Sequence, residues 1–463
     1  MDYFKFNKCE KTIALLIFLT YFPMIISDLP FRDDLSRTYW GFVGLTNLGR
    51  PFADYIYSIL GLGFEGVNLS PLPKIISLLM LSFTSINIFR LFFKPNEWSG
   101  VFISALAVCN PFMLQNIAYQ YDCLPMAISV LLCTLAIKKL KKITAFDILF
   151  CSALLFSGLA LYQSSIVVAC ILCCSIIMKM IMYSHPIKET INRALGLLIS
   201  AFIAITAYYL LIVKNNKAVS SRSELAGIDG VKTNLYFLSD RISELYSGYG
   251  YILLTMSAIV ILLTVIHLTY KKKHLSSVFY AVSLPVVIMI SFMPSLMLAE
   301  GFVGPRVLMA IALLPLYVSL LRSNKVINFT SSSIAIILYF NAIIVSFAFS
   351  GDMKAQYKRY DTISNLVIQS SQSNAAASIN RISIHCRSSK SQEESIYRRF
   401  NPFISWLNPE EPWAIRFYIR NKGEKRIISD WSDCGEIPSK GFQYENNYFR
   451  LYQLGNDYHY FLK

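Results

Sequence analysis

Long apolar runs recur along the chain, separated by polar segments. Each run is continuous rather than alternating, and most are long enough to cross a hydrocarbon core of about 30 Å as a helix. Only a helix satisfies its own backbone hydrogen bonds in lipid, and continuous runs do not fit the alternating strands of a barrel. We predict about eleven spanning helices, at residues 11–27, 72–93, 99–116, 124–137, 145–161, 164–182, 194–213, 250–270, 276–296, 306–321 and 331–350.

The composition agrees with this pattern. Hydrophobic residues make up 55% of the 463 residues and charged residues 15%, whereas soluble domains average about 25% charged residues. These values argue against a soluble globular enzyme, a disordered chain, a collagen-like fibre and a coiled coil. The predicted fold class is an α-helical polytopic membrane protein with a small α+β domain at its C-terminus.

Lysine and arginine set the orientation of the spans. If the N-terminus is inside, the lysine-rich segments 138–142 and 271–273 both fall in short inside loops. The first run is interpreted as a retained anchor, because no small-residue cleavage site follows it. The net charge of +15 is thus largely explained by topology. No nucleic-acid motif accompanies it, so we exclude nucleic acid as a partner.

The chain divides at the end of the last apolar run. Residues 1–350 form the predicted transmembrane domain, with long outside loops at 28–71 and 214–249. Long loops in compact proteins are commonly functional, so the working surface is expected outside. The second loop is either a mobile lid or a surface loop with a short helix. Residues 351–463 form an outside domain whose aromatic-rich runs predict strands. These aromatics fit either stacking on the sugar rings of a bound molecule or a domain core.

The densest outside cluster of charge follows the first span. Asp33 and Asp34 stand between two arginines, the second of which is Arg37, and the run Gly49-Arg50-Pro51 comes next. A carboxylate can act as a general base toward a hydroxyl. Arginine can clamp a phosphate, and adjacent acids can bind a divalent cation. The alternative is a solvated loop whose charges pair with one another. Residues 51–64 have helical spacing and predict a short amphipathic helix in the membrane interface.

Four further polar residues lie at the outside ends of predicted spans: Asp122, Tyr162, Gln163 and Arg306. Polar and ionisable groups at membrane depth are costly and commonly functional. Asp122 and Arg306 are charged, flanked by apolar sequence and on the same side as Asp33, which favours a functional role. For Tyr162 and Gln163, the alternative is to cap the hairpin between two spans and to anchor it at the interface.

The order of these motifs resembles one known family. Asp33-Asp34-Leu35-Ser36-Arg37 after a first span, then Trp40-Gly41, then Gly49-Arg50-Pro51, is similar to the serotype-converting O-antigen glucosyltransferases of enterobacterial phages and prophages, the Gtr type-II family. Three later stretches extend the resemblance over about the first 350 residues: Tyr121-Asp122, Leu161-Tyr162-Gln163-Ser164-Ser165 and Pro305-Arg306.

The resemblance implies a GT-C-like glycosyltransferase that uses a lipid-linked sugar. The implied donor is undecaprenyl-phosphate glucose, and the implied acceptor is a sugar of the lipid-linked O-antigen repeat. Transfer would take place on the periplasmic side of the bacterial inner membrane and cause serotype conversion. The N-terminus would be cytoplasmic and the C-terminal domain periplasmic. Other proteins would make and flip the donor.

The resemblance implies which acids are catalytic, and the chemistry of the residues suggests the other roles. Related enzymes place an acid of the first outside loop at the catalytic centre, which here is Asp33 or Asp34. Direct displacement with inversion is expected, with arginines on the phosphate. The predicted substrate-binding residues are Arg37, Arg50, Asp122, Tyr162, Gln163 and Arg306. The alternatives are an O-antigen polymerase, a flippase of polyprenyl-linked sugars and a non-catalytic sensor.

No cofactor is expected, and whether the site binds a divalent cation stays open. Most of the ten cysteines lie in or near spans, where cysteine is a common small buried residue. Cys386 and Cys434 are the pair in the C-terminal segment. An oxidising compartment would permit a disulfide between them, and we predict one.

Overall fold

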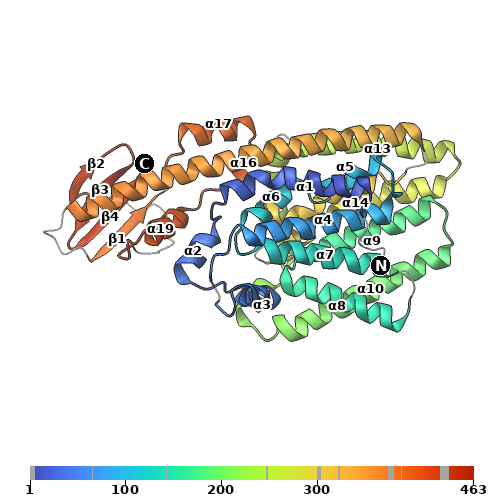
Figure 1. Cartoon of the computed structure of the whole chain (residues 1–463), viewed down its shortest axis with the longest axis horizontal. Coiled ribbons are helices and arrows are strands. Elements are labelled where there is room, and N and C mark those ends of the chain that lie inside the picture. The colour runs from blue at the N-terminus through green and yellow to red at the C-terminus, as the bar shows by residue number, and fades with distance from the viewer. Residues whose placement is uncertain are drawn as a thin grey trace.

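The computed structural model describes residues 6–64, 66–140, 143–246, 249–299, 304–321, 324–373, 380–386, 388–427 and 437–463. It is mostly helical, with a small β-sheet near the C-terminus. The helices run side by side in an elongated bundle, and the sheet lies beyond one end of it (Figure 1). A helical membrane protein with a small mixed C-terminal domain is confirmed in this outline.

Every predicted span contains helix. The bundle elements are α1 (Lys8–Ser27), α4 (Leu72–Phe92), α5 (Ser99–Leu106), α6 (Pro111–Ala118), α7 (Cys123–Lys139), α8 (Ala145–Leu161), α9 (Ser165–Met182), α10 (Ile187–Tyr208), η3 (Tyr209–Val213), α13 (Tyr249–Tyr270), α14 (His274–Met297), η4 (Pro305–Leu313), α15 (Leu314–Val318) and α16 (Lys325–Ser373). Among the described residues, six helices are long and apolar enough to cross a membrane, or seven if the bent pair α5 and α6 is one span. The total of about eleven stays a prediction, because helices such as α8 are shorter.

Two predicted spans are irregular. The run at 99–116 is broken, since α5 and α6 are bent by 52° relative to each other. Pro111 lacks an N–H and disfavours helical backbone at the residue before it. Asn110 is accordingly extended, and its side chain caps α6. The run at 306–321 begins as the 3₁₀ helix η4 and continues as the short helix α15.

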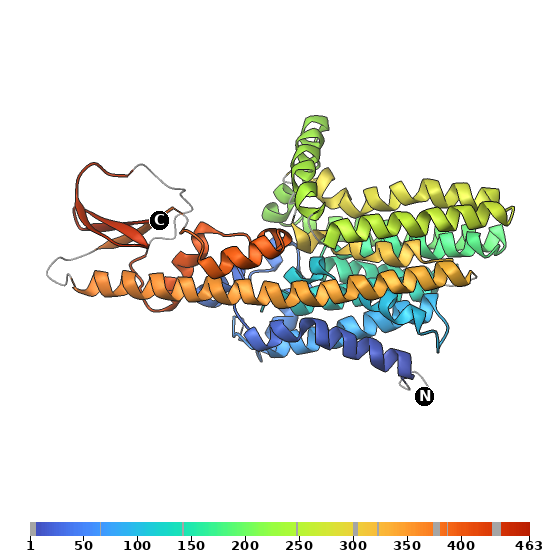
Figure 2. The ribbon, with the colours of Figure 1, turned by 90° about the horizontal axis from the view of Figure 1, so that it is seen from above.

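The last predicted span ends at residue 350, but α16 runs on to Ser373 and is 49 residues long. At 1.5 Å per residue it measures about 73 Å, which far exceeds the hydrocarbon core. Its second half leaves the bundle and becomes the spine of the C-terminal domain (Figure 2). Gly351 permits close packing on the way, because a Cβ there would lie 2.4 Å from the ring of Tyr397 in α17 (Gln392–Phe400). The predicted boundary at 350 thus falls inside a helix.

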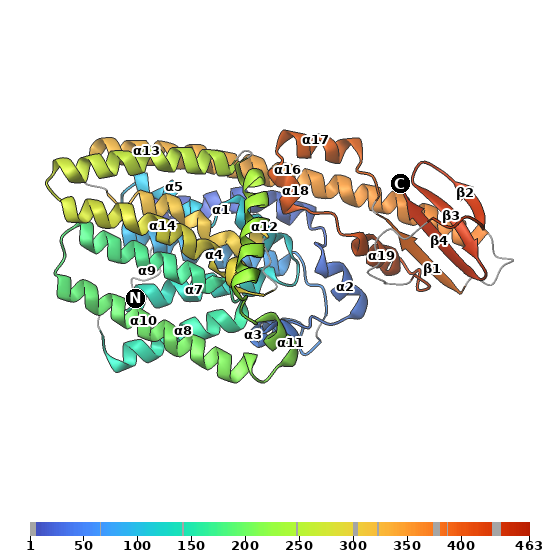
Figure 3. The ribbon, with the colours of Figure 1, turned by 180° about the vertical axis from the view of Figure 1, so that it is seen from behind.

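The C-terminal domain contains the predicted mixture of strands and helices. Its strands are β1 (Arg381–His385), β2 (Phe442–Glu445), β3 (Phe449–Leu454) and β4 (Asp457–Leu462), in the order β1-β4-β3-β2. The β1–β4 pair is parallel and the other two pairs are antiparallel. The short helices α18 (Phe403–Leu407) and α19 (Pro412–Asn421) lie between the sheet and the bundle (Figure 3).

Many of the C-terminal aromatics fill a core rather than an exposed surface. Trp413, Phe449, Tyr458 and Tyr460 are buried with the end of α16. This cluster favours the core interpretation for these four residues. Phe442 on the edge strand β2 is 55% exposed instead. Buried ion pairs fasten α16 to α17, with Arg359 Nε 2.8 Å from Glu394 Oε2 and Arg398 Nε 3.0 Å from Asp352 Oδ1.

Helices outside the predicted spans cover the end of the bundle that faces the C-terminal domain. They are α2 (Asp33–Trp40), η2 (Thr46–Leu48), α3 (Pro51–Leu60), α11 (Lys217–Arg222) and α12 (Ile228–Tyr246). Helix α12 runs across the bundle rather than along it (Figure 3), and α3 is seen nearly end-on in Figure 1. The predicted helix at 51–64 is present as α3, which ends at Leu60. It is amphipathic, because Ala53 and Tyr57 are buried while Tyr55 and Ile59 are exposed.

The cysteines divide as the sequence predicts. Eight are free and lie in the first half of the chain: Cys9, Cys109, Cys123, Cys133, Cys151, Cys170, Cys173 and Cys174. Cys386 is disulfide-bonded. Cys434 lies outside the described residues, so the pairing of these two stays a prediction.

Candidate functional site

Helix α2 presents the two adjacent acids. Asp33 and Asp34 form its first turn, where the positive end of the helix dipole favours carboxylates. The helix ends after Trp40 at Gly41, which adopts the left-handed conformation with φ 67°. Successive residues on a helix point about 100° apart. The two carboxylates therefore meet different surroundings.

Asp34 is directed inward and is completely buried. Its Oδ2 accepts hydrogen bonds from the N–H groups of Phe31 and Gln120, both at 2.8 Å. Its Oδ1 accepts from the N–H of Tyr121 at 3.3 Å. Burial raises the pKa of Asp34 to about 7, although Arg37 and the backbone N–H groups oppose this rise. Asp34 joins α2 to the segment before α7 and has no oxygen exposed to a substrate.

Asp33 is directed outward, and its side chain is 38% exposed. Its Oδ2 lies 4.0 Å from Nη1 of Arg306, which is beyond hydrogen-bond distance. Arg306 lies in the first turn of η4, with its guanidinium over the ring of Tyr119 at 5.1 Å and donating to the hydroxyl of that ring. An accessible carboxylate can take a proton from a hydroxyl, and the guanidinium beside it can bind an anion.

Asp122 holds two of the arginines together. It is 2% exposed at the start of α7. Its Oδ2 lies 2.5 Å from Arg37 Nη1, and its Oδ1 lies 3.2 Å from Arg50 Nη1. Burial alone would raise the pKa of Asp122, but the two guanidinium groups lower it below its ordinary value. Arg37 is buried, whereas the side chain of Arg50 retains 14% exposure.

The Gly49-Arg50-Pro51 run shapes the turn that delivers Arg50. Gly49 has φ 77°, and a Cβ there would lie 2.5 Å from the hydroxyl of Tyr208 and 2.8 Å from Nε2 of Gln163. Only glycine fits both the conformation and the space. Pro51 starts α3, a position that needs no N–H donor. Between them, Arg50 points back toward Asp122.

Tyr162 and Gln163 close the network from the α8–α9 hairpin. Gln163 Oε1 accepts from Arg50 Nε at 3.2 Å, and its Nε2 donates to Leu48 O at 2.7 Å. The guanidinium of Arg50 lies 4.8 Å from the centre of the Tyr162 ring. The Tyr162 hydroxyl donates to the carbonyl of Arg306 at 3.2 Å. Both residues are therefore part of the site as well as of the hairpin.

The structure thus brings all eight predicted site residues into one connected group. The contacts link Asp33 to Arg306, Arg306 to Tyr162, Tyr162 to Arg50, Arg50 to Gln163 and Asp122, and Asp122 to Arg37 beside Asp34. The buried acids are paired, as the alternative of self-paired charges expects, whereas Asp33 remains accessible. Their catalytic and binding roles stay predictions.

Several residues of this group carried no separate prediction. Tyr119 carried no prediction of its own, yet it contacts Arg306 by its ring and its hydroxyl. Tyr208 lies within an apolar run, so no sequence signal distinguishes it from a membrane anchor. Behind the site, buried Lys74 pairs with Asp28 at 3.0 Å. Within the described residues, no group of three or more His, Cys, Asp or Glu side chains could hold a metal ion. A divalent cation stays a prediction.

Comparison with known proteins finds matches to the part of the chain that contains the site. The family model described as glucosyl transferase GtrII matches residues 22–318, which include all eight site residues and exclude the C-terminal domain. A protein of Salmonella phage P22, described as an uncharacterized 55.3 kDa protein in the gtrB 5' region, is 26% identical over 265 residues. That match covers 54% of this chain and 54% of the relative, so the chain spans about half the length of the curated relative. No solved structure matches the chain.

Proposed function

The chain belongs to the GtrII glucosyltransferase family, and from this premise we propose that it transfers glucose from undecaprenyl-phosphate glucose to a sugar of the O-antigen repeat. The reaction takes place on the periplasmic side of the bacterial inner membrane and changes the serotype. Other proteins make the donor and move it across the membrane to the periplasmic side. This proposal requires a hexosyltransferase site that a lipid phosphate can reach.

The surroundings of the site support a donor that stays in the membrane. Helix α3 begins directly after Arg50, and Phe52, Tyr55 and Ile59 on it are exposed. An amphipathic helix with exposed aromatics lies in the membrane interface. Arg50 is therefore at the level of lipid headgroups, where the phosphate of a polyprenyl donor is found.

The observation that carries the proposal is the accessible Asp33 carboxylate beside Arg306. Asp33 takes the proton of the acceptor hydroxyl as its oxygen attacks the anomeric carbon. The bond from that carbon to the phosphate oxygen breaks, and its electron pair leaves with the phosphate. Arg306 and Arg50 stabilise the charge on the leaving group, because arginine binds phosphate with two parallel hydrogen bonds. A single displacement inverts the anomeric carbon.

The remaining residues act through these three. Asp34 holds α2 by its backbone contacts, and the Arg37–Asp122 pair holds Arg50. Tyr162 and Gln163 fix the orientation of the Arg50 guanidinium. We therefore narrow the catalytic base to Asp33 and treat Asp34, Arg37 and Asp122 as positioning residues.

The test is the structure of the O-antigen in a smooth strain that expresses this chain together with the donor-making proteins. Mass spectrometry and linkage analysis should find one additional hexose in each repeat, lost in Asp33→Asn. An unchanged repeat with altered chain length would indicate a polymerase. A wholly unchanged polymer would overturn the proposal in favour of a flippase or a sensor.

A further inference from the structure

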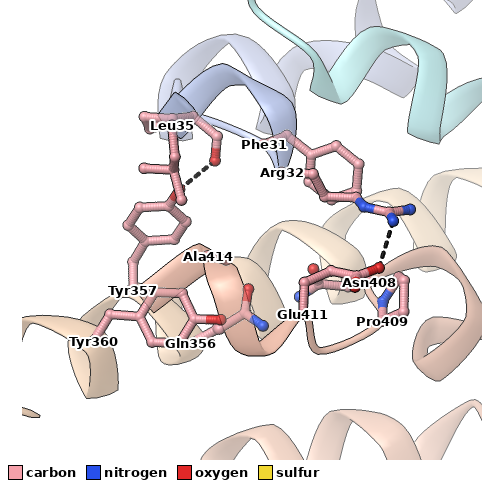
Figure 4. Close-up of a pocket in the computed structure, with 11 residues that line it drawn as sticks. Phe31, Arg32, Leu35, Gln356, Tyr357, Tyr360, Asn408, Pro409, Glu411 and Ala414 are labelled. Atoms are coloured by element: carbon pink, nitrogen blue, oxygen red, sulfur yellow. Dashed lines mark hydrogen bonds and ion pairs between the residues drawn. The ribbon is translucent and has the colours of Figure 1, made fainter. Parts of the chain in front are cut away.

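The C-terminal domain lies outside the part of the chain matched by the family model, yet it contacts helix α2 directly. Figure 4 shows a small pocket lined by residues from the start of α2, from α16 and from the segment that leads into α19. Arg32, the residue before Asp33, forms an ion pair across it with Glu411.

Further contacts join the same two elements. Asn421 Nδ2 donates to the carbonyl of Leu35 at 3.0 Å. The Leu35 side chain is 3% exposed and belongs to the core of the C-terminal domain. The guanidinium of Arg420 lies 4.2 Å from the centre of the Tyr39 ring. Contacts from α19 and its leading segment thus follow α2 along most of its eight residues.

The lead-in to α2 has an unusual backbone. Arg32 has φ 48° and ψ −109°, a conformation that L-residues rarely adopt. Such a residue persists only where its surroundings determine it several times over. Tyr357 on α16 donates to the carbonyl of Pro30 at 2.5 Å, and Phe31 packs edge-on against Tyr119 at 4.9 Å. Glu411 adds a constraint on the side chain of Arg32 itself.

Glu411 also compensates the positive charge of Arg32. The Arg32 side chain is 16% exposed, and its Nε is buried without a hydrogen-bond partner. Within the described residues, Glu411 is the only acceptor of its guanidinium. Because an isolated helix of eight residues is marginal in water, the position of α2 depends on such tertiary contacts.

We propose that the C-terminal domain is a working part of the transfer site, with Glu411 as a positioning residue that sets, through Arg32, the direction of α2 and the place of Asp33 beside Arg306. The effect on transfer rests on the proposed function; the effect on α2 does not. The domain therefore cannot be removed without loss of the catalytic geometry.

The experiment compares Glu411→Gln with the full-length wild-type protein in lipid nanodiscs. Glu411→Gln keeps the size of the side chain and removes its charge. The matched control is Glu424→Gln, which breaks an ion pair of 2.7 Å with Arg426 in the same domain but away from α2. Arg32→Lys keeps a positive charge toward Glu411 and tests rescue.

Hydrogen exchange measures how firmly α2 is held, and it needs no assay of activity. The amides of residues 36–41 should exchange about tenfold faster in Glu411→Gln, while Glu424→Gln and Arg32→Lys resemble wild type. Unchanged exchange in Glu411→Gln would overturn the proposal. A general loss of protection would mean unfolding, and the charge-swapped pair Arg32→Glu with Glu411→Arg then decides, since it must restore α2 if the ion pair matters.

Glucose transfer measures the consequence. A misplaced base lowers kcat by about 10- to 100-fold and leaves KM for the lipid donor nearly unchanged. A rise in KM alone in Glu411→Gln would contradict positioning of Asp33. Absence of transfer in the wild type would refute the proposed function, while the exchange result would still decide whether Glu411 holds α2.

Discussion

Asp33→Asn and Asp34→Asn test the assignment of the base most directly. The two substitutions are chemically identical and one residue apart, so any difference between them comes from their surroundings. Asp33→Asn removes the charge of a side chain that is 38% exposed and whose Oδ2 lies 4.0 Å from Nη1 of Arg306. Solvent screens such a pair, so the free energy of unfolding should change by less than about 1 kcal/mol. Transfer should fall roughly 10²–10⁴-fold, the usual effect of losing one positioned base.

At position 34 the same substitution should act on stability. If the Asn oxygen takes the place of Oδ2 and keeps Phe31 and Gln120, its amide meets the N–H of Tyr121, which donates to Oδ1 in the wild type. A buried donor without an acceptor costs about 1–3 kcal/mol. The resulting loss of transfer should follow the loss of folded protein.

The assay measures glucose transfer per amount of folded protein, together with thermal unfolding in detergent. Asp33→Asn should melt like wild type and transfer almost nothing, whereas Asp34→Asn should melt earlier. Transfer by Asp33→Asn within about threefold of wild type would refute the reasoning, because a general base contributes far more. An inactive Asp34→Asn protein of wild-type stability would move the base to Asp34.

Three further predictions follow from single residues. Gly49→Ala should destabilise the protein by about 1–3 kcal/mol through its backbone conformation alone, and it should also displace Gln163. Thermal unfolding measures the loss of stability. Gly227→Ala is the control and should unfold like wild type, because a Cβ at Gly227 meets open space. Burial raises the pKa of Asp34 from 3.8 to about 7, so the folded state binds this proton more tightly, and the contribution of Asp34 to stability should fall as pH rises from about 4 to 7. Melting temperatures measured across that range should depend less steeply on pH in Asp34→Asn than in the wild type. An equal dependence on pH in the two proteins would contradict this prediction. Under denaturing, non-reducing conditions, eight of the ten cysteines should react with a thiol reagent, and ten would exclude the disulfide of Cys386.

The sequence predicted the convergence of the site better than its details. Asp33, Asp122 and Arg306 were grouped because alternating spans put their ends on one side of a membrane, and the structure joins them. The helical runs themselves are set by continuous apolar sequence, which is a strong signal. Their irregularities depend on one or two residues, such as Asn110 and Pro111, whose effect competes with the apolar pattern around them.

The extent of α16 could not be predicted from hydropathy. Composition changes at residue 350 from apolar to polar, and this change was interpreted as the end of the helix. Helix propensity does not change there, since the residues that follow are mostly compatible with helix and lack proline. What extends the helix is tertiary packing: Asp352 and Arg359 pair with α17, and Tyr360 enters the C-terminal core. These contacts join residues that are distant in sequence, so no local pattern shows them.

The distinction between Asp33 and Asp34 depends on three-dimensional surroundings for the same reason. Both acids favour the first turn of a helix, and nothing in their order says which one faces the protein. The inward carboxylate is held by three backbone N–H groups, and Asp122 is held by two guanidinium groups. A general base must accept a hydrogen bond from the hydroxyl whose proton it takes. Of these three carboxylates, Asp33 is the one whose oxygens are accessible for that bond. The two buried acids hold the surrounding structure, which is the reason for the proposal that Asp33 is the base.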